Sequence, residues 1–248
     1  MARDTTVAVF RPGDERLDDA AELIESLGAT PVPDAMLAVE PTGATPRTDA
    51  DIVVLTSKTG VELAATAGWE PADATVTAIG ESTADAMRAA DYPVDIVPEE
   101  YTSAGLVEAL TGDVDGKRVE VARSDHGSDV LTDGLEDAGA YVHETILYRL
   151  VRPDGAGQSV ELAAEGDIDA AAFTSSLTVA HFIEAAAERG IRDAAIEGLN
   201  DAVVGVIGPP TRETAEEYGI DVDVVPDTAD FEELACDVVE TAAPTHHE

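Results

Sequence analysis

Serine and threonine recur where predicted strands give way to predicted helices. A helix N-terminus at the carboxyl end of a parallel strand offers free N–H groups and a positive dipole end, which suit a carboxylate or phosphate. Capping alone would explain any single case, because Ser and Thr are favoured N-caps. As a set they predict a site for an anionic ligand, and its members are Ser57, Ser82, Thr83, Ser175, Ser176 and Thr211.

Several basic residues stand at the same junctions or beside a predicted crossing between domains. The chain has only 14 Lys and Arg residues, so this placement supports an anion site. Ion pairs with the abundant carboxylates are the alternative explanation for each residue. The candidates are Arg11, Lys58, Arg123, Arg149 and Arg212.

The chain contains no standard catalytic motif. G-x-S-x-G, H-E-x-x-H and the P-loop are absent, and the five histidines show no metal-ligand spacing. Cys236 is the single cysteine, which excludes a cysteine-based metal site and an internal disulfide. We therefore expect no metal site.

The charge is strongly negative, with 52 acidic and 14 basic residues and a net charge of -38. Nucleic acid and anionic membrane surfaces are excluded as partners, because they need clustered Lys and Arg. Regular apolar periodicity argues against disorder and for a folded, acidic, hydrated surface of the halophilic type. No apolar run is long enough to span a membrane and no leader pattern opens the chain, so we expect a cytoplasmic protein.

Short Val- and Ile-rich runs alternate with amphipathic helical patterns along the chain. Gly28, Gly139, Gly190 and Gly219 follow predicted helices, as C-capping glycines do. This alternation predicts an α/β fold with parallel sheets of the Rossmann or flavodoxin type. The predicted strands cover residues 7–10, 52–56, 76–79, 118–122, 170–173 and 203–207.

The sequence also repeats itself. Thr-Ser at 56–57 returns at 174–175, and AIGEST at 78–83 returns as VIGPPT at 206–211, with about ten extra residues near 191–201. The opening segment 7–33 resembles 118–148, so it completes the second copy. We predict a discontinuous domain, 1–36 plus 155–248, with a second domain, 42–148, inserted through connectors 37–41 and 149–154. Two similar lobes with two connectors predict a cleft between them.

These segments resemble the uroporphyrinogen-III synthase family. The matching stretches follow the family order: VAVFRP, VVLTSKTGV, AIGESTADAM, LYRLVRP, AAFTSSLTV, VIGPPTRETA and VVPDTADFEELA. The resemblance implies two α/β domains joined by a two-stranded β connector, with the substrate in the cleft between them.

The family reaction closes hydroxymethylbilane, a linear octacarboxylate, with inversion of ring D and loss of water. It needs no cofactor or metal, and the product serves haem, sirohaem or cobalamin synthesis. The resemblance further implies a monomer that receives its substrate from porphobilinogen deaminase. The enzyme's main task would be orientation, which agrees with the missing catalytic motif.

The family's cleft tyrosine falls on Tyr148, which would assist departure of the hydroxyl. Its loop threonines fall on Thr83 and Thr211, and its Thr-Ser strand ends on Ser57 and Ser175. Its arginine after the third strand of the inserted domain falls on Arg123. The chain departs from the family at Pro210, which replaces a frequent threonine, and in the SDHGS loop at 124–128.

Two other functions fit the same layout. A two-lobed sensor of a small anionic metabolite would share the hinge and the helix termini but show no turnover. A nucleotide-sugar transferase on two Rossmann-like lobes would need a nucleotide-binding fingerprint, and G-x-G-x-x-G is absent.

Overall fold

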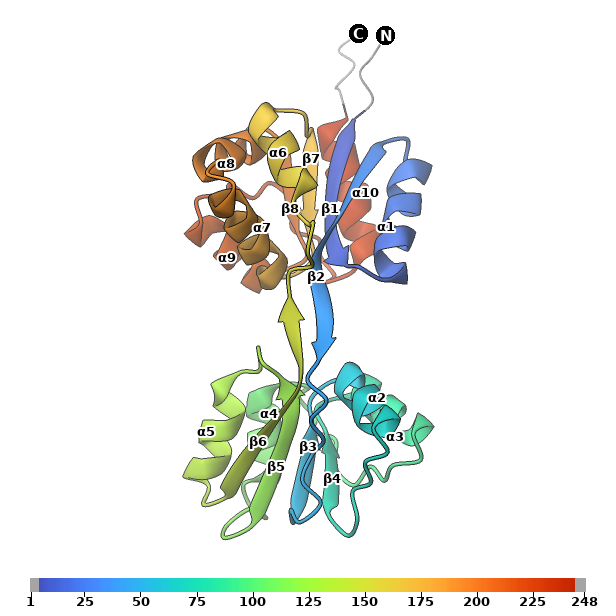
Figure 1. Ribbon diagram of the computed structural model, residues 1–248, viewed down its shortest axis with the longest axis vertical. Helices are drawn as coiled ribbons and strands as arrows, with labels where there is room; N and C mark the ends of the chain where they lie inside the picture. The colour runs from blue at the N-terminus through green and yellow to red at the C-terminus, as the bar shows by residue number, and fades with distance from the viewer. Residues whose placement is uncertain (1–4, 244–248) are drawn as a thin grey trace. The chain divides into compact units, whose positions relative to one another are not determined.

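The structure is a computed structural model of the chain that describes residues 5–243. The chain forms two compact units. Unit 1 comprises Met1–Ala38 and Val151–Glu248, and unit 2 comprises Val39–Leu150. Each is a parallel sheet covered by helices on both faces, so the predicted α/β class is confirmed (Figure 1).

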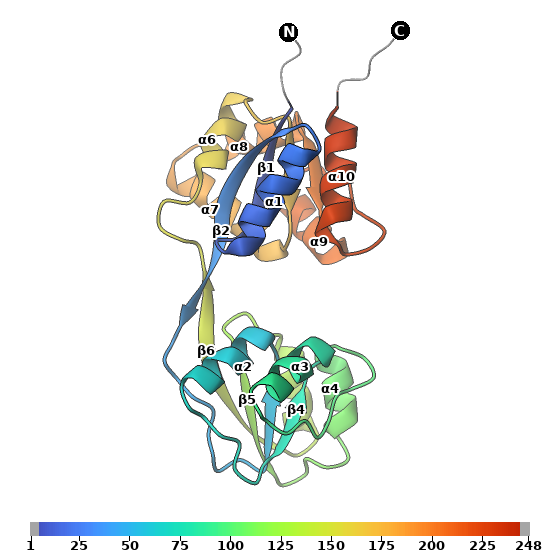
Figure 2. The ribbon, with the colours of Figure 1, turned by 90° about the vertical axis from the view of Figure 1, so that its right-hand side faces the viewer.

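Unit 1 has four parallel strands in the order β2, β1, β7, β8, with bounds Thr30–Pro41, Thr6–Pro12, Ala170–Phe173 and Val203–Val206. One face packs against α1 (Glu15–Ser26) and α10 (Phe231–Ala242). The other face carries four helices (Figure 2). These are α6 (Gln158–Glu165), α7 (Ser176–Glu188), α8 (Arg192–Asn200) and α9 (Pro209–Glu217).

Three phenylalanines anchor the larger core of unit 1. Phe10 stacks on Phe173 with ring centroids 4.3 Å apart, and Phe182 meets both rings edge-on. All three are fully buried, and such aromatic pairs contribute about 0.5–1.5 kcal/mol beyond their buried area. This core fixes the carboxyl ends of β1 and β7, where the predicted site residues Arg11 and Ser175 lie.

Unit 2 repeats this plan with four parallel strands in the order β6, β5, β3, β4, with bounds Tyr141–Val151, Arg118–Ser124, Ile52–Leu55 and Thr75–Ala78. Helices α2 (Lys58–Thr66) and α3 (Glu81–Ala89) cover one face. Helices α4 (Ser103–Leu110) and α5 (Asp129–Asp137) cover the other.

The strand registers make the two units equivalent residue by residue. In unit 1, neighbouring positions on β1, β7 and β8 are occupied by Phe10, Phe173 and Val206. In unit 2, the equivalent positions on β5, β3 and β4 are occupied by Ala122, Leu55 and Ala78. Within the described residues, unit 1 has two helices that unit 2 lacks, α6 and α8. The extra residues predicted near 191–201 form α8.

The chain passes between the units in β2 and β6, which are neighbours in the hydrogen-bonded strand order. The Thr42 amide donates to the Leu147 carbonyl at 3.0 Å. The predicted helix ends at Gly28 and Gly139 are confirmed by φ values of +85° and +92°, which favour glycine. No helix within residues 5–243 is long and apolar enough to cross a membrane.

Candidate functional site

Two of the predicted serines cap helices at the carboxyl ends of strands. Ser57 precedes α2, and its Oγ accepts the Gly60 N–H at 3.0 Å. Ser175 precedes α7 and forms a capping box with Thr178. They occupy equivalent places, and each lines a pocket of its own unit.

The unit 2 pocket that Ser57 lines, called the unit 2 pocket below, has a volume of about 210 Å³ and lies at the ends of β3, β4 and β5. Hydroxyl groups are concentrated in its wall, together with one arginine and one histidine. Among its lining residues are Thr56, Ser57, Ser103, Arg123, Ser124, His126, Ser128 and Tyr148. Such a wall offers donors to the oxygens of a polar ligand.

A break in strand register places Tyr148 in this wall. Arg123 lies opposite Ile146, but the next residue, Ser124, lies opposite Tyr148. Successive side chains of a strand normally alternate between faces. Because of the irregularity, Leu147 and Tyr148 both pack into the core cluster beneath α2 and α3.

The Tyr148 hydroxyl contacts the cap of α2. Its Oη donates to Ser57 Oγ at 3.0 Å, and the residue is buried, with 7 % of its surface exposed. Ser57 Oγ thus accepts from both Tyr148 and Gly60. The structure brings the predicted catalytic tyrosine and a predicted binding serine into direct contact.

Arg123 lies in the same pocket but is already paired. It is buried, and its guanidinium donates to the Ser128 carbonyl at 2.6 Å and forms an ion pair with Glu144. Asp129 lies 3.6 Å away, while Arg123 Nε has no hydrogen-bond partner. Arg123 therefore stabilises the pocket wall, and its Nε is a donor that remains unpaired.

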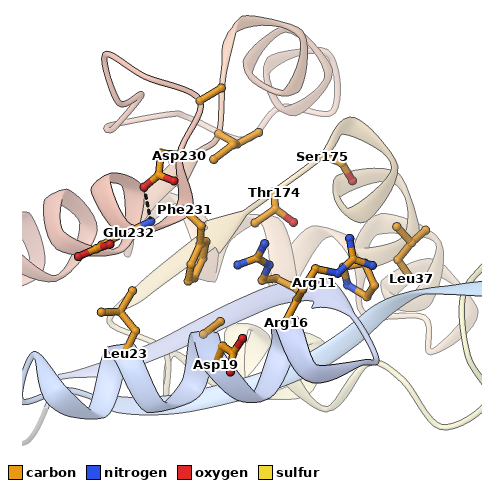
Figure 3. Close-up of a pocket in the computed structure, with 14 residues that line it drawn as sticks. Arg11, Arg16, Asp19, Leu23, Leu37, Thr174, Ser175, Asp230, Phe231 and Glu232 are labelled. Carbon is orange, nitrogen blue, oxygen red and sulfur yellow. Dashed lines mark hydrogen bonds between the residues drawn. The ribbon is translucent and has the colours of Figure 1, made fainter. Parts of the chain in front are cut away.

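The pocket of unit 1 occupies the equivalent place and is larger, at about 540 Å³ (Figure 3). Arg11, at the end of β1, stacks its guanidinium on the Phe231 ring at 4.4 Å from the ring centroid. Burial lowers the pKa of Arg11 from its usual value, and no ion pair holds its guanidinium within the described chain. Its buried Nε has no hydrogen-bond partner, so an anionic group could bind there in competition with the nearby carboxylates of Asp14, Asp19 and Asp230.

The remaining predicted site residues line neither pocket. Thr83 and Thr211 are buried inside α3 and α9, because Gly80 and Gly208 occupy the N-cap positions. Three basic residues and two serines lie elsewhere on the two units. Lys58 pairs with Glu62, Arg212 pairs with Glu216, Ser176 Oγ donates to the Pro210 carbonyl, and Ser82 and Arg149 are exposed.

Sequence reasoning did not single out Phe231, Arg16 or Ser103, which also line the pockets. Phe231 and Ser103 are each the first residue of a helix, after the N-caps Asp230 and Thr102. Aromatic residues make up only 4 % of the chain. A phenylalanine that opens a helix was therefore a signal that could have been used.

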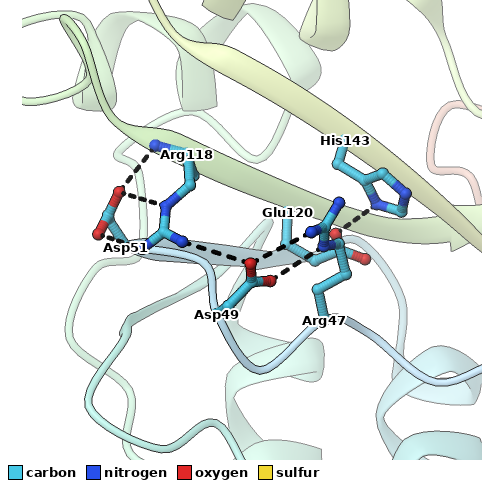
Figure 4. A network of polar contacts seen from close by, with 6 residues as sticks. All are labelled: Arg47, Asp49, Asp51, Arg118, Glu120 and His143. Carbon is cyan, nitrogen blue, oxygen red and sulfur yellow. Dashed lines mark hydrogen bonds and ion pairs between the residues drawn. The ribbon is translucent and has the colours of Figure 1, made fainter.

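A separate polar network lies around β5 in unit 2 (Figure 4). Glu120 is fully buried, and its Oε2 lies 2.7 Å from Nδ1 of His143 on β6. Its Oε1 has no partner. The adjoining ion pairs, Arg47 with Asp49 and Arg118 with Asp49 and Asp51, are exposed. No cluster of metal-ligand type is found within residues 5–243.

Fold and pockets together define a class: a protein of two similar α/β units, with polar pockets at the carboxyl ends of their parallel strands. A family model described as uroporphyrinogen-III synthase HemD matches residues 18–236. The chain belongs to the uroporphyrinogen-III synthase family, which confirms the predicted family and the class of cyclising lyase.

Individual relatives agree with this assignment. A protein of Methanothermobacter thermautotrophicus, provisionally named uroporphyrinogen-III synthase, is 36 % identical over 86 % of this chain and 90 % of its own length. A protein of the same provisional name from Archaeoglobus fulgidus is 32 % identical over 60 % of this chain and 62 % of its own length. A crystal structure of a mutant uroporphyrinogen III synthase from Thermus thermophilus has the same fold, with a TM-score of 0.67, 22 % identity and coverage of 96 % and 98 %.

Proposed function

We propose that this chain closes hydroxymethylbilane to uroporphyrinogen III, with inversion of ring D and release of water. The main support is membership of the family over nearly the whole chain. The wall of the unit 2 pocket, with the Tyr148 hydroxyl beside Ser57, agrees with this chemistry. The cleft between the domains, inferred from the sequence, is part of this proposal.

In the proposed reaction, Tyr148 assists departure of the terminal hydroxyl of the substrate. The equivalent strand ends of the two units supply donors for its carboxylates. Arg11 is suited to this role because it has no ion pair within the described residues, and helix N-termini at Ser57 and Ser175 add positive potential. Most of the rate gain would come from holding a flexible chain in a shape that closes.

A coupled assay in molar KCl tests the proposed function. Porphobilinogen is supplied through a deaminase, and the oxidised products are separated into isomers I and III. Isomer III that forms only when this chain is present supports the proposal. If a folded protein yields isomer I alone, the proposal is wrong, and binding of small anionic metabolites is then the function to test.

We further propose that the protein works as a monomer in the cytoplasm of a cell with concentrated internal salt, and that porphobilinogen deaminase supplies its substrate. The support is the net charge of -38. At low ionic strength the acidic residues repel one another, and together they repel an octacarboxylate substrate. Molar salt reduces the Debye length to about 3 Å and removes this repulsion.

The salt proposal predicts a large change in stability and activity. Between roughly 0.1 M and 2 M KCl, the unfolding midpoint should rise by more than about 10 °C because long-range repulsion is screened. For the same reason, kcat/KM should rise about tenfold. Thermal unfolding and the coupled assay across this range measure both effects. If stability and kcat/KM stay flat between these concentrations, the proposed adaptation is wrong.

A further inference from the structure

Ser57 joins the one tyrosine of the unit 2 pocket to the N-terminus of α2. Its Oγ accepts from the Tyr148 hydroxyl and from the Gly60 amide, both at 3.0 Å. A serine oxygen accepts two hydrogen bonds and donates one. Both acceptor positions are therefore occupied, and the Ser57 proton alone is free to change partner.

The surroundings leave Ser57 little freedom. A Cβ added at Gly60 would lie 3.1 Å from Ser57 Oγ and 3.3 Å from Leu147 Cδ1. Tyr148 is buried, and the register break in β6 fixes its direction. The phenol oxygen is thus held at one point of the pocket wall by packing on one side and by Ser57 on the other.

The equivalent place in unit 1 has the serine but no tyrosine. Leu37 lies opposite Pro12 after the same register break and so corresponds to Tyr148. Ser175 uses its hydroxyl in the capping box with Thr178 instead. Because helix capping needs only the serine, the tyrosine contact in unit 2 has a purpose beyond capping.

We propose that Ser57 is the positioning residue for Tyr148 in the ring-closing reaction, and that it changes from acceptor to donor as the reaction proceeds. This inference rests on the proposed function. At rest the phenol donates to Ser57. When the phenol proton is transferred to the substrate, Ser57 turns its free proton to the phenolate while its oxygen keeps the bond from Gly60.

The step balances in atoms and electrons. The C–O bond of the terminal hydroxymethyl group breaks, and its electron pair leaves with the oxygen. That oxygen takes the Tyr148 proton and departs as water, while the pyrrole nitrogen lone pair completes the azafulvene cation. Ring closure later releases a proton as the pyrrole regains aromaticity, and the phenolate takes it up.

Because Ser57 stabilises a charge that develops only during reaction, it should affect kcat and leave KM almost unchanged. We expect Ser57→Ala to lower kcat about ten- to hundredfold, as loss of a hydrogen bond to a charged group does. Ser57→Thr keeps the hydroxyl and should restore most of the rate. Tyr148→Phe should lower kcat by at least about a hundredfold.

A double-mutant cycle separates positioning from plain structural support. In the Tyr148→Phe background, Ser57→Ala should change the residual rate of isomer III formation less than about twofold, since its partner is gone. Thr102→Ala is the matched control. Thr102 caps α4 in the same unit through an equal 3.0 Å bond from the Gly105 N–H, and it lies outside both pockets.

The outcomes are distinct. Ser57→Ala and Thr102→Ala should lower the unfolding midpoint to a similar degree, and only Ser57→Ala should lower kcat. The inference is overturned if the effects of Ser57→Ala and Tyr148→Phe multiply, if Ser57→Thr is as slow as Ser57→Ala, or if Thr102→Ala slows turnover equally. If the wild-type chain makes no isomer III, the proposed function is wrong, which is a different result from a failure of the double-mutant cycle in an active enzyme.

Discussion

Units 1 and 2 share one sheet design but place different groups in equivalent pockets. In unit 1, Arg11 stacks on Phe231 and has no ion pair among the described residues. In unit 2, the equivalent Arg123 is buried and paired with Glu144, and Ser103 stands in the place of Phe231. One arginine is available to a ligand, while the other supports the wall around Tyr148.

The sheets differ equally at their opposite ends. Ala8 and Val32 face each other in unit 1 beneath α6, which packs on that part of the sheet. Their counterparts in unit 2 are Glu120 and His143, which line a pocket together with Arg47, Asp49 and Ala50 of the loop before β3. Where a helix is missing, a polar pair has replaced the apolar pair. The duplicated scaffold therefore tolerates changes in chemistry wherever its helical cover differs.

The largest expected effect comes from moving a unit 2 residue into unit 1 at the last strand of each sheet. Gly205 of β8 corresponds to Thr77 of β4, since they form the equivalent bridges to Val224 and Ile96. A Cβ at Gly205 would lie 2.2 Å from Val238 Cγ2. Gly205→Thr should therefore destabilise unit 1 by about 3 kcal/mol or more.

Thermal unfolding followed by circular dichroism in molar KCl measures this loss. Thr77→Val is the matched control in unit 2. Thr77 Oγ1 is buried without a partner, so the change should be neutral or stabilise by up to about 1 kcal/mol. A Gly205→Thr variant as stable as the wild type would refute the close approach of α10 to β8.

The next effect concerns the buried pair of unit 2. His143→Ala should destabilise unit 2 by about 2 kcal/mol, because the fully buried carboxylate of Glu120 would lose its hydrogen-bond partner. The double variant Glu120→Ala with His143→Val copies unit 1. It should lie within about 1 kcal/mol of the wild type, since no buried charge remains.

Trp69 is the single tryptophan and is buried in unit 2, so its fluorescence during urea unfolding reports on this unit. The single variants Glu120→Ala and His143→Val complete the thermodynamic cycle with this double variant. A double variant that is less stable than His143→Ala would show that the pair itself stabilises the unit, contrary to the comparison with Ala8 and Val32.

The smallest expected effect is the difference in unfolding free energy between variants of Arg123 and Arg11. Arg123→Met should lower the unfolding free energy by about 2 kcal/mol, because Glu144 and the Ser128 carbonyl lose their partner. Arg11→Met should cost about 1 kcal/mol or less, since it removes only the contact with Phe231. Urea unfolding of both variants measures the difference. Equal losses would mean that Arg11 is structural too.

The alternation of strands and helices and the internal repeat were readable from the sequence because both depend on local periodicity and capping. Gly28 and Gly139 end helices as predicted. The state of Arg123 was not readable, because its partner Glu144 comes from a neighbouring strand. The contact between Tyr148 and Ser57 depends on a register break in β6, for which the sequence carries no local signal.

The candidate set of hydroxyl residues shows a similar limit. The sequence places Thr83 and Thr211 at strand-to-helix junctions, as it does Ser57 and Ser175. Only the serines are N-caps, because Gly80 and Gly208 take that place in α3 and α9, and the threonines turn inward. A difference of three positions, between the N-cap and the third residue of the helix, decides whether a hydroxyl reaches a pocket.

The insertion of unit 2 within unit 1 sets an order of events during synthesis. Strand β1 pairs with β7, so Val7–Phe10 must wait on the ribosome until Ala170–Phe173 emerges. At about 5–20 residues per second this delay is roughly 10–30 s, long enough for unit 2 to fold first. The Thr42–Leu147 hydrogen bond then brings the ends of that unit together and shortens the loop that unit 1 must close. Folding of the inserted unit thus lowers the entropy cost of closing the unit that surrounds it.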